Sequence, residues 1–214
     1  ATGSSAPLRL VLSQQHAEGG ATKVLTTLKA GRNEITVPQL STLDFEKGGQ
    51  LYVEYTGASD TEQWGVRVSG ATAAPALERL ARTTAYVEAL EASVPALEAQ
   101  HNAKHRDSEN SAVKYAYDAQ NCVMNATDIL LDQMMYSVPA QQILAGSGEG
   151  STVERAQRLL ASLDAMDQMM ELFYQRKGLA SSFAEGTSAA VITANSLPSQ
   201  HLNIRYTRMG AGAF

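Results

Sequence analysis

The chain has 214 residues, of which 44% are hydrophobic and 18% are charged. This composition predicts a packed core in one large or two small domains and excludes a disordered chain. The net charge of −5, without any run of lysine or arginine, argues against nucleic-acid binding, and no apolar run is long enough to span a membrane. A single cysteine, Cys122, excludes an internal disulfide framework.

Residues 1–72 have the pattern of a small antiparallel β-sandwich. Apolar residues alternate over 8–14, and again over 51–55 and 64–68. The stretch 22–40 contains two strand-like runs separated by Gly-Arg-Asn, which predicts a β-hairpin. Short strands with turn residues between them are typical of a sandwich.

Residues 73–178 are rich in Ala, Leu and Glu and predict a mainly helical subdomain with short strands. Pro75 suits the first turn of the first helix, and Pro95 should end or kink that helix. A second helix is predicted over 151–177, because its opening Ser-Thr-Val-Glu has the capping-box pattern. The glycine that follows is a natural stop.

The region between these two helices is mixed. Residues 114–126 alternate weakly and predict a strand, whereas 128–135 predict a short helix capped by Thr127 or Asp128. The glycine-rich stretch 146–150 predicts a flexible loop before the second helix.

Residues 179–214 return to strand-like runs at 191–193 and 203–207. The sequence then stops at Phe214, in an apolar segment rich in Gly and Ala that carries no terminating signal. We therefore expect 179–214 to be the β-rich start of a domain that is truncated at this point. The three segments together predict an α+β fold.

His101 and His105 would share one face of a helix, at the spacing that zinc peptidases use in H-E-x-x-H. That motif needs a glutamate after the first histidine, as general base on the metal-bound water, but Asn102 occupies the position. Lys104 and Arg106 are nearby cations that disfavour a bound metal ion. We interpret the pair as a solvated helix end and predict no catalytic and no metal-binding residue in this chain.

Three other residues have a functional interpretation beside a structural one. Cys122 could act as a nucleophile, but its apolar neighbours favour a small buried hydrophobe. Trp64 could stack on a sugar or a peptide, although packing is the default at a strand position. Asn125 begins an Asn-Ala-Thr glycosylation sequon, a three-residue pattern that is common by chance. The remaining histidines, His16 and His201, complete no recognisable site.

Five segments carry a resemblance to a known family. In chain order they read LKAGRNEITVPQL, GGQLYVEYTG, WGVRVSG, LFYQRKGL and IRYTRMGAGAF. Their order resembles that of the enhancin-like zinc metallopeptidases, some of which are O-glycopeptidases. In that family, a segment like the last one lies just ahead of the zinc-binding helix.

The resemblance implies a secreted zinc endopeptidase that cleaves peptide bonds next to O-glycosylated serine or threonine in mucin-like host glycoproteins. Family members hold one zinc ion with H-E-x-x-H and a downstream glutamate. No position here matches that motif, so the resemblance places zinc in the parent enzyme and none in this chain. It implies that 179–214 form the first strands of a truncated metallopeptidase domain. Polar residues around 203–210 are then expected to line one wall of the substrate groove.

Two other interpretations stay open. The chain could be a non-catalytic module that binds a glycan or a protein, or it could be a structural exported protein. Continuation of the gene past Phe214 separates these alternatives. An H-E-x-x-H motif soon after that residue would favour the peptidase, and the remainder of the same polypeptide would then be a partner of this chain.

Overall fold

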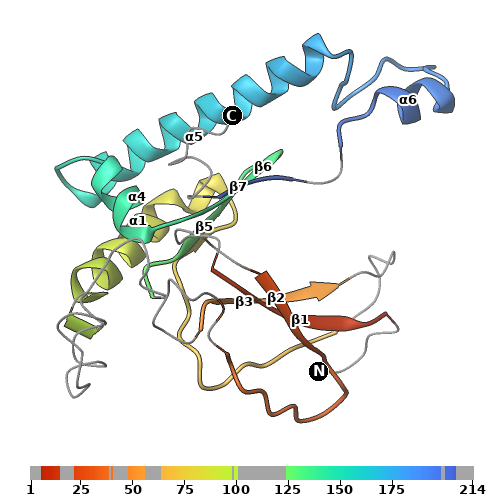
Figure 1. The fold of residues 1–214 in the computed structure, drawn as a ribbon. Helices are drawn as coiled ribbons and strands as arrows, with labels where there is room; N and C mark the ends of the chain where they lie inside the picture. The colour runs from red at the N-terminus through yellow and green to blue at the C-terminus, as the bar shows by residue number, and fades with distance from the viewer. Residues whose placement is uncertain are drawn as a thin grey trace.

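The computed structural model describes residues 6–14, 22–38, 40, 48–55, 64–97, 99–100, 124–198 and 201–205. The chain folds into two β-sheets and a set of helices, which confirms the predicted α+β class (Figure 1). The strands are β1 (Leu8–Ser13), β2 (Thr22–Thr27), β3 (Gln50–Tyr55), β4 (Ala76–Leu77), β5 (Thr127–Leu130), β6 (Met134–Val138) and β7 (Leu202–Arg205). The helices are η1 (Leu80–Arg82), α1 (Thr83–Ser93), η2 (Val94–Ala96), α4 (Ala140–Gly146), α5 (Thr152–Arg176) and α6 (Ala189–Asn195).

The N-terminal sheet is antiparallel, with the strand order β2-β1-β3. Strands β1 and β3 confirm the strands predicted over 8–14 and 51–55. Leu8, Leu10 and Leu12 of β1 are buried, as the alternation requires. Among the described residues of 1–72, this sheet stands alone, without the second sheet of a sandwich.

The hairpin predicted over 22–40 is wrong, because among the described residues of that stretch only the first strand, β2, forms. The Lys29 amide donates to Asn33 Oδ1 at 2.9 Å, and Asn33 Nδ2 donates to the Lys29 carbonyl at 2.8 Å. The side chain thereby satisfies backbone groups that a partner strand would otherwise pair. The strand predicted over 64–68 is also wrong, since the segment makes only an isolated bridge at Gly65.

The second sheet is mixed, with the strand order β4-β5-β6-β7. Strand β5 is antiparallel to β6, whereas β4 pairs with β5 in parallel and β7 pairs with β6 in parallel. The helix predicted over 128–135 is wrong, because this stretch forms the β5–β6 hairpin. Thr127, Ile129 and Leu131 are all buried, which is the period of two that a strand requires. The Leu131 amide closes the turn by donating to the Met134 carbonyl at 2.8 Å.

The two long helices match their predictions in part. Pro75 precedes strand β4 and is not in a helix, so that prediction is wrong, whereas Pro95 lies in η2 directly after α1 and ends it as expected. Helix α5 confirms the prediction over 151–177, including its capping box. The Glu154 amide donates to Ser151 Oγ at 3.4 Å, and the Ser151 amide donates to Glu154 Oε2 at 2.8 Å.

Of the glycine-rich stretch 146–150, Gly146 ends α4 and residues 147–150 form the predicted loop, whose backbone α5 holds. Arg158 Nε donates to the Ser147 carbonyl at 2.7 Å, and the same guanidinium donates to the Glu149 carbonyl. Arg155 also lies 3.4 Å from the Glu149 carboxylate. The first turns of α5 therefore position the loop that precedes them.

The strand predicted over 191–193 is wrong, because this run lies in helix α6. Ser188 caps the helix by accepting the Val191 amide at 3.4 Å, and alanines flank the β-branched residues. Strand β7 confirms the first part of the strand predicted over 203–207.

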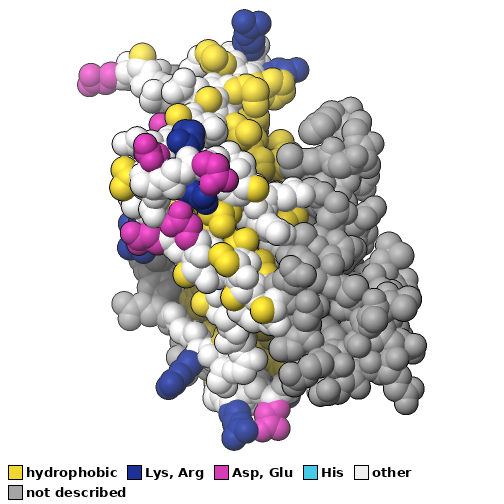
Figure 2. All heavy atoms as spheres, turned by 90° about the vertical axis from the view of Figure 1, so that its left-hand side faces the viewer, with side chains coloured by type: hydrophobic (Ala, Val, Ile, Leu, Met, Phe, Trp, Pro, Cys, Tyr) yellow, Lys and Arg dark blue, Asp and Glu magenta, His cyan; other side chains and the backbone are white. Residues whose placement is uncertain are grey.

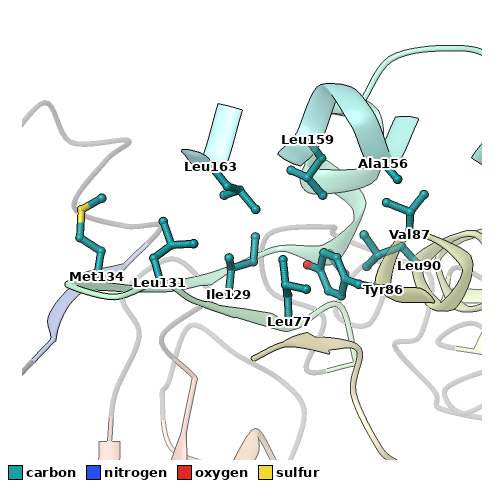
Figure 3. Close-up of a cluster of buried hydrophobic side chains, with 11 residues drawn as sticks. Leu77, Tyr86, Val87, Leu90, Ile129, Leu131, Met134, Ala156, Leu159 and Leu163 are labelled. Carbon is teal, nitrogen blue, oxygen red and sulfur yellow. The ribbon is translucent and has the colours of Figure 1, made fainter. Parts of the chain in front are cut away.

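One hydrophobic core lies between the mixed sheet and the helices α1, α4 and α5 (Figure 3). Its buried members are Leu77, Tyr86, Val87, Leu90, Ile129, Leu131, Met134, Ala140, Ala156, Leu159 and Leu163. Ile204 of β7 packs against the same cluster, so residues from beyond 178 add to the core built by 73–178. The boundaries 1–72, 73–178 and 179–214 stay predictions.

Candidate functional site

The carboxyl group of Asp128 is the centre of a polar cluster that joins the two sheets. Tyr52, on β3, places its hydroxyl 2.5 Å from Asp128 Oδ2, and Ser137, on β6, donates to Oδ1 at 2.9 Å. The Tyr52 hydroxyl also lies 2.6 Å from Gln50 Oε1. Three strands from two sheets therefore converge on one acidic side chain.

Burial controls the protonation of this cluster. It raises the pKa of Asp128 above the ordinary carboxyl value, although hydrogen bonds from Tyr52, Ser137 and Gln50 lower that pKa. Burial and the adjacent Asp128 carboxylate both raise the pKa of the Tyr52 hydroxyl. Because protein hydroxyls contact both oxygens of Asp128, its position fits a structural connection between the sheets better than a free general acid or base.

A second polar chain lies beside the first. The Tyr86 hydroxyl of α1 is 2.7 Å from Thr127 Oγ1, which donates to the Pro75 carbonyl at 2.7 Å. Burial is the main cause that raises the pKa of Tyr86. Neither Thr127 nor Asp128 caps a helix as predicted, because both lie inside β5. Thr127 instead connects α1 to the residue ahead of β4.

Replacing Asp128 with asparagine should change how stability depends on pH. A carboxyl whose pKa is raised by folding stabilises the protein below its unfolded pKa of about 3.9, and this contribution is lost as pH rises through the folded pKa. Each unit of that shift is worth about 1.4 kcal/mol. We expect the stability advantage of the wild type over Asp128→Asn to shrink from pH 4 to pH 7 in urea denaturation.

Glu154→Gln provides a control of opposite sign. Hydrogen bonds from Ser151 lower the pKa of Glu154, so its contribution is present above the unfolded pKa and is lost as pH falls. The wild-type advantage over Glu154→Gln should therefore grow with pH. Parallel pH profiles for the two variants would contradict the assigned environment of Asp128.

The sequon at Asn125 is buried. Asn125, Ala126 and Thr127 are all closed to solvent, and Asn125 Oδ1 accepts the Gln141 amide at 2.8 Å. Gln141 lies in the first turn of α4, whose N-cap Pro139 supplies no side-chain cap. Asn125 therefore satisfies a helix-terminal donor from a distant part of the chain, and the folded protein cannot present it for glycosylation.

Asn125→Ala should lower the free energy of unfolding by about 1–3 kcal/mol, because the Gln141 amide loses its acceptor in a buried site. Asn125→Asp keeps the Oδ1 acceptor and should restore part of the loss. Thermal denaturation followed by circular dichroism measures both. A negligible effect of the alanine variant would show that water replaces the amide oxygen.

No group of three potential metal ligands from His, Cys, Asp and Glu comes together in the part of the chain that the structure describes. His201 is exposed and directly precedes β7. His16, His101, His105 and Cys122 lie outside the described residues, so the interpretation of the histidine pair and of the cysteine stays a prediction. The described residues do not fit a zinc site, and no chemical step is assigned to one.

Acidic side chains also gather between α5 and the β5–β6 turn. Burial and the neighbouring Asp132 and Asp164 carboxylates raise the pKa of Asp167. Burial and Asp167 together raise the pKa of Tyr136. This arrangement lacks the ligand set of a metal site and belongs to the flank of the core.

Trp64 is 37% exposed and lies against Tyr55, at the end of β3, with ring centroids 5.6 Å apart and planes tilted by 39°. The default expectation of a packed tryptophan is therefore met only in part.

Comparison with solved structures gives a fold-level match. The chain is similar to the M60 catalytic domain of ZmpC from Clostridium perfringens, whose structure was solved in complex with the sialyl T antigen. The TM-score is 0.57 and the sequence identity 16%; the match covers 93% of this chain and 34% of the other. The chain thus spans about a third of that structure. No family model matches the sequence, and no curated protein matches it.

M60 peptidases are the enhancin-like metallopeptidases, so the fold agrees with the resemblance in the sequence. At 16% identity the likeness establishes the fold alone. In the described residues, no helix has the length and apolar character needed to cross a membrane.

Proposed function

We propose that this chain is a portion of a secreted zinc metalloendopeptidase that cleaves peptide bonds next to O-glycosylated serine or threonine. The observation that carries the proposal is the likeness to an M60 catalytic domain over 93% of the chain. The neighbour was solved with a sialylated glycan, which supports mucin-like glycoproteins as the substrate class. The zinc ligands and the catalytic glutamate would be residues outside this chain.

The decisive experiment compares two polypeptides. The 214-residue chain and the full product of its gene are incubated with an O-glycosylated mucin-type peptide and with its unglycosylated form. We expect only the longer product to cleave, only the glycosylated peptide to be cut, and a chelator to abolish cleavage. Cleavage by the 214-residue chain alone, or a longer product without activity, would refute the proposal.

A finer part of the proposal concerns β7. Asn203 is exposed on this strand, within the segment 203–210 that we expect to line one wall of the substrate groove. Asn203→Ala in the longer product should raise KM for the glycopeptide more than it lowers kcat. Unchanged kinetics would remove β7 from the groove.

A non-catalytic glycan-binding module is the second candidate function, and Trp64, which is 37% exposed and packs against Tyr55, favours it. Aromatic rings present apolar faces on which sugar rings can stack. If this candidate holds, the 214-residue chain binds mucin-type glycans in an array experiment and Trp64→Ala abolishes the signal. Binding that survives Trp64→Ala would exclude this surface.

A further inference from the structure

The apolar face of α5 continues past the core into solvent. Leu159, Leu163, Met166, Met170 and Phe173 recur at alternating spacings of four and three residues, which places them along one helix face. The first two are buried and point into the cluster under the helix (Figure 3). Met170 packs partly against that cluster, whereas Phe173 is 52% exposed. One continuous face is therefore core at its start and surface at its end.

The exposed end of this face is wide. Met166, Met169, Leu172 and Phe173, which we call the α5 surface, are between 38% and 58% exposed. Figure 2 shows hydrophobic side chains gathered near the top of the molecule, at the height of the C-terminal half of α5 in Figure 1. Single exposed apolar residues are ordinary, but four on adjacent turns of one helix mark an interaction site.

The α5 surface is held in place by its own attachments. The Tyr136 hydroxyl of β6 lies 3.0 Å from Met166 Sδ, which fixes the helix over the mixed sheet at the point where the surface begins. At the other end, the Lys177 ammonium lies 5.7 Å from the centre of the Phe173 ring. A preformed apolar helix face can be covered without a large ordering cost.

We propose that the α5 surface is covered by a further segment of the same, longer polypeptide. This inference rests on the proposed function, in which the chain is one part of a metallopeptidase domain. Two observations favour this occupant. The α5 surface continues the internal core without a break. The match covers only 34% of the M60 chain, so a protein built like that neighbour has many further residues of the same polypeptide that could cover this helix face.

Cysteine labelling tests the proposal without requiring activity. In a Cys122→Ser background, Met169→Cys and Leu172→Cys report on the α5 surface. Val153→Cys, at a 55% exposed position in the first turn of the same helix, is the matched control. In the 214-residue chain all three sites should react with a maleimide at similar rates. In the full product of the gene, the two α5-surface sites should react at least about tenfold more slowly, while the control stays fast.

Three results would overturn the proposal: a gene that ends at Phe214, equal labelling of all sites in the longer product, or concentration-dependent protection in the 214-residue chain. The last result would identify a second copy of the chain as the occupant. Labelling needs neither zinc nor substrate, so it tests the interface independently of activity. If the α5-surface sites are protected in the longer product but no glycopeptide is cleaved, the interface stands and the proposed function fails.

Discussion

Replacing Leu90 with alanine will lower the free energy of unfolding by about 2–5 kcal/mol, the usual cost of truncating a buried leucine. Leu90 has no exposed surface and lies on α1, within the cluster that α1 shares with α5 and the mixed sheet. Because the Leu90 side chain is surrounded by other core residues, removing its methyl groups leaves a cavity that water does not fill. For a chain of this length, such a loss lowers Tm by on the order of 10 °C. Urea denaturation followed by circular dichroism measures it.

Leu172→Ala is the matched control, since it makes the same chemical change on a helix where the side chain is 58% exposed. In the 214-residue chain its effect should stay within about 0.5 kcal/mol. Equal effects for the two variants would mean that α1 does not pack in the core as described.

Replacing Gly49 with alanine will destabilise the N-terminal sheet by about 2–5 kcal/mol, as a clash with the backbone adds to conformational strain. Gly49 directly precedes β3 and has a φ of 142°. A Cβ atom there would lie 2.4 Å from the Ser13 carbonyl oxygen. The preceding Gly48 carbonyl accepts Gln14 Nε2 at 3.0 Å, so the end of β1 holds both glycines and limits relaxation.

Hydrogen exchange of the β1 and β3 amides should report this loss as faster exchange than in the wild type, together with a lower urea midpoint. Gly146→Ala is the control, because it ends α4 without a positive φ and meets no atom within 4 Å. That variant should be neutral or more stable by up to about 1 kcal/mol. A neutral Gly49→Ala would show that β3 can shift away from β1.

The long, capped helix α5 and the alternating strands β1 and β3 could be predicted from the sequence, whereas the type of the short apolar runs at 127–135 and 191–193 could not. Helix α5 carries its capping box and many turns of helical periodicity. The run at 127–135 is short and apolar, and such a run does not by itself distinguish a helix from a strand. Tertiary packing decides between helix and strand for this run, because it places Thr127 and Ile129 on the buried face of a hairpin.

The sequence indicates one member of the polar cluster, Asp128, but not its partners. An aspartate inside an apolar run, as in Thr-Asp-Ile-Leu, signals a polar group that needs partners when buried. Its main partner, Tyr52, lies 76 residues earlier in the chain. No local pattern connects Tyr52 to Asp128, because the contact exists only once the two sheets have met.

The position of β7 has a consequence for the order in which the protein assembles during synthesis. This strand pairs Met134 with Leu202 and Tyr136 with Ile204, so the mixed sheet closes only after α4, α5 and α6 have been made. Domains fold as the chain emerges from the ribosome, and pairings between remote segments form slowly. Until Arg205 emerges, the outer side of β6 has no partner strand, and a nascent chain stalled before that residue would expose it to chaperones.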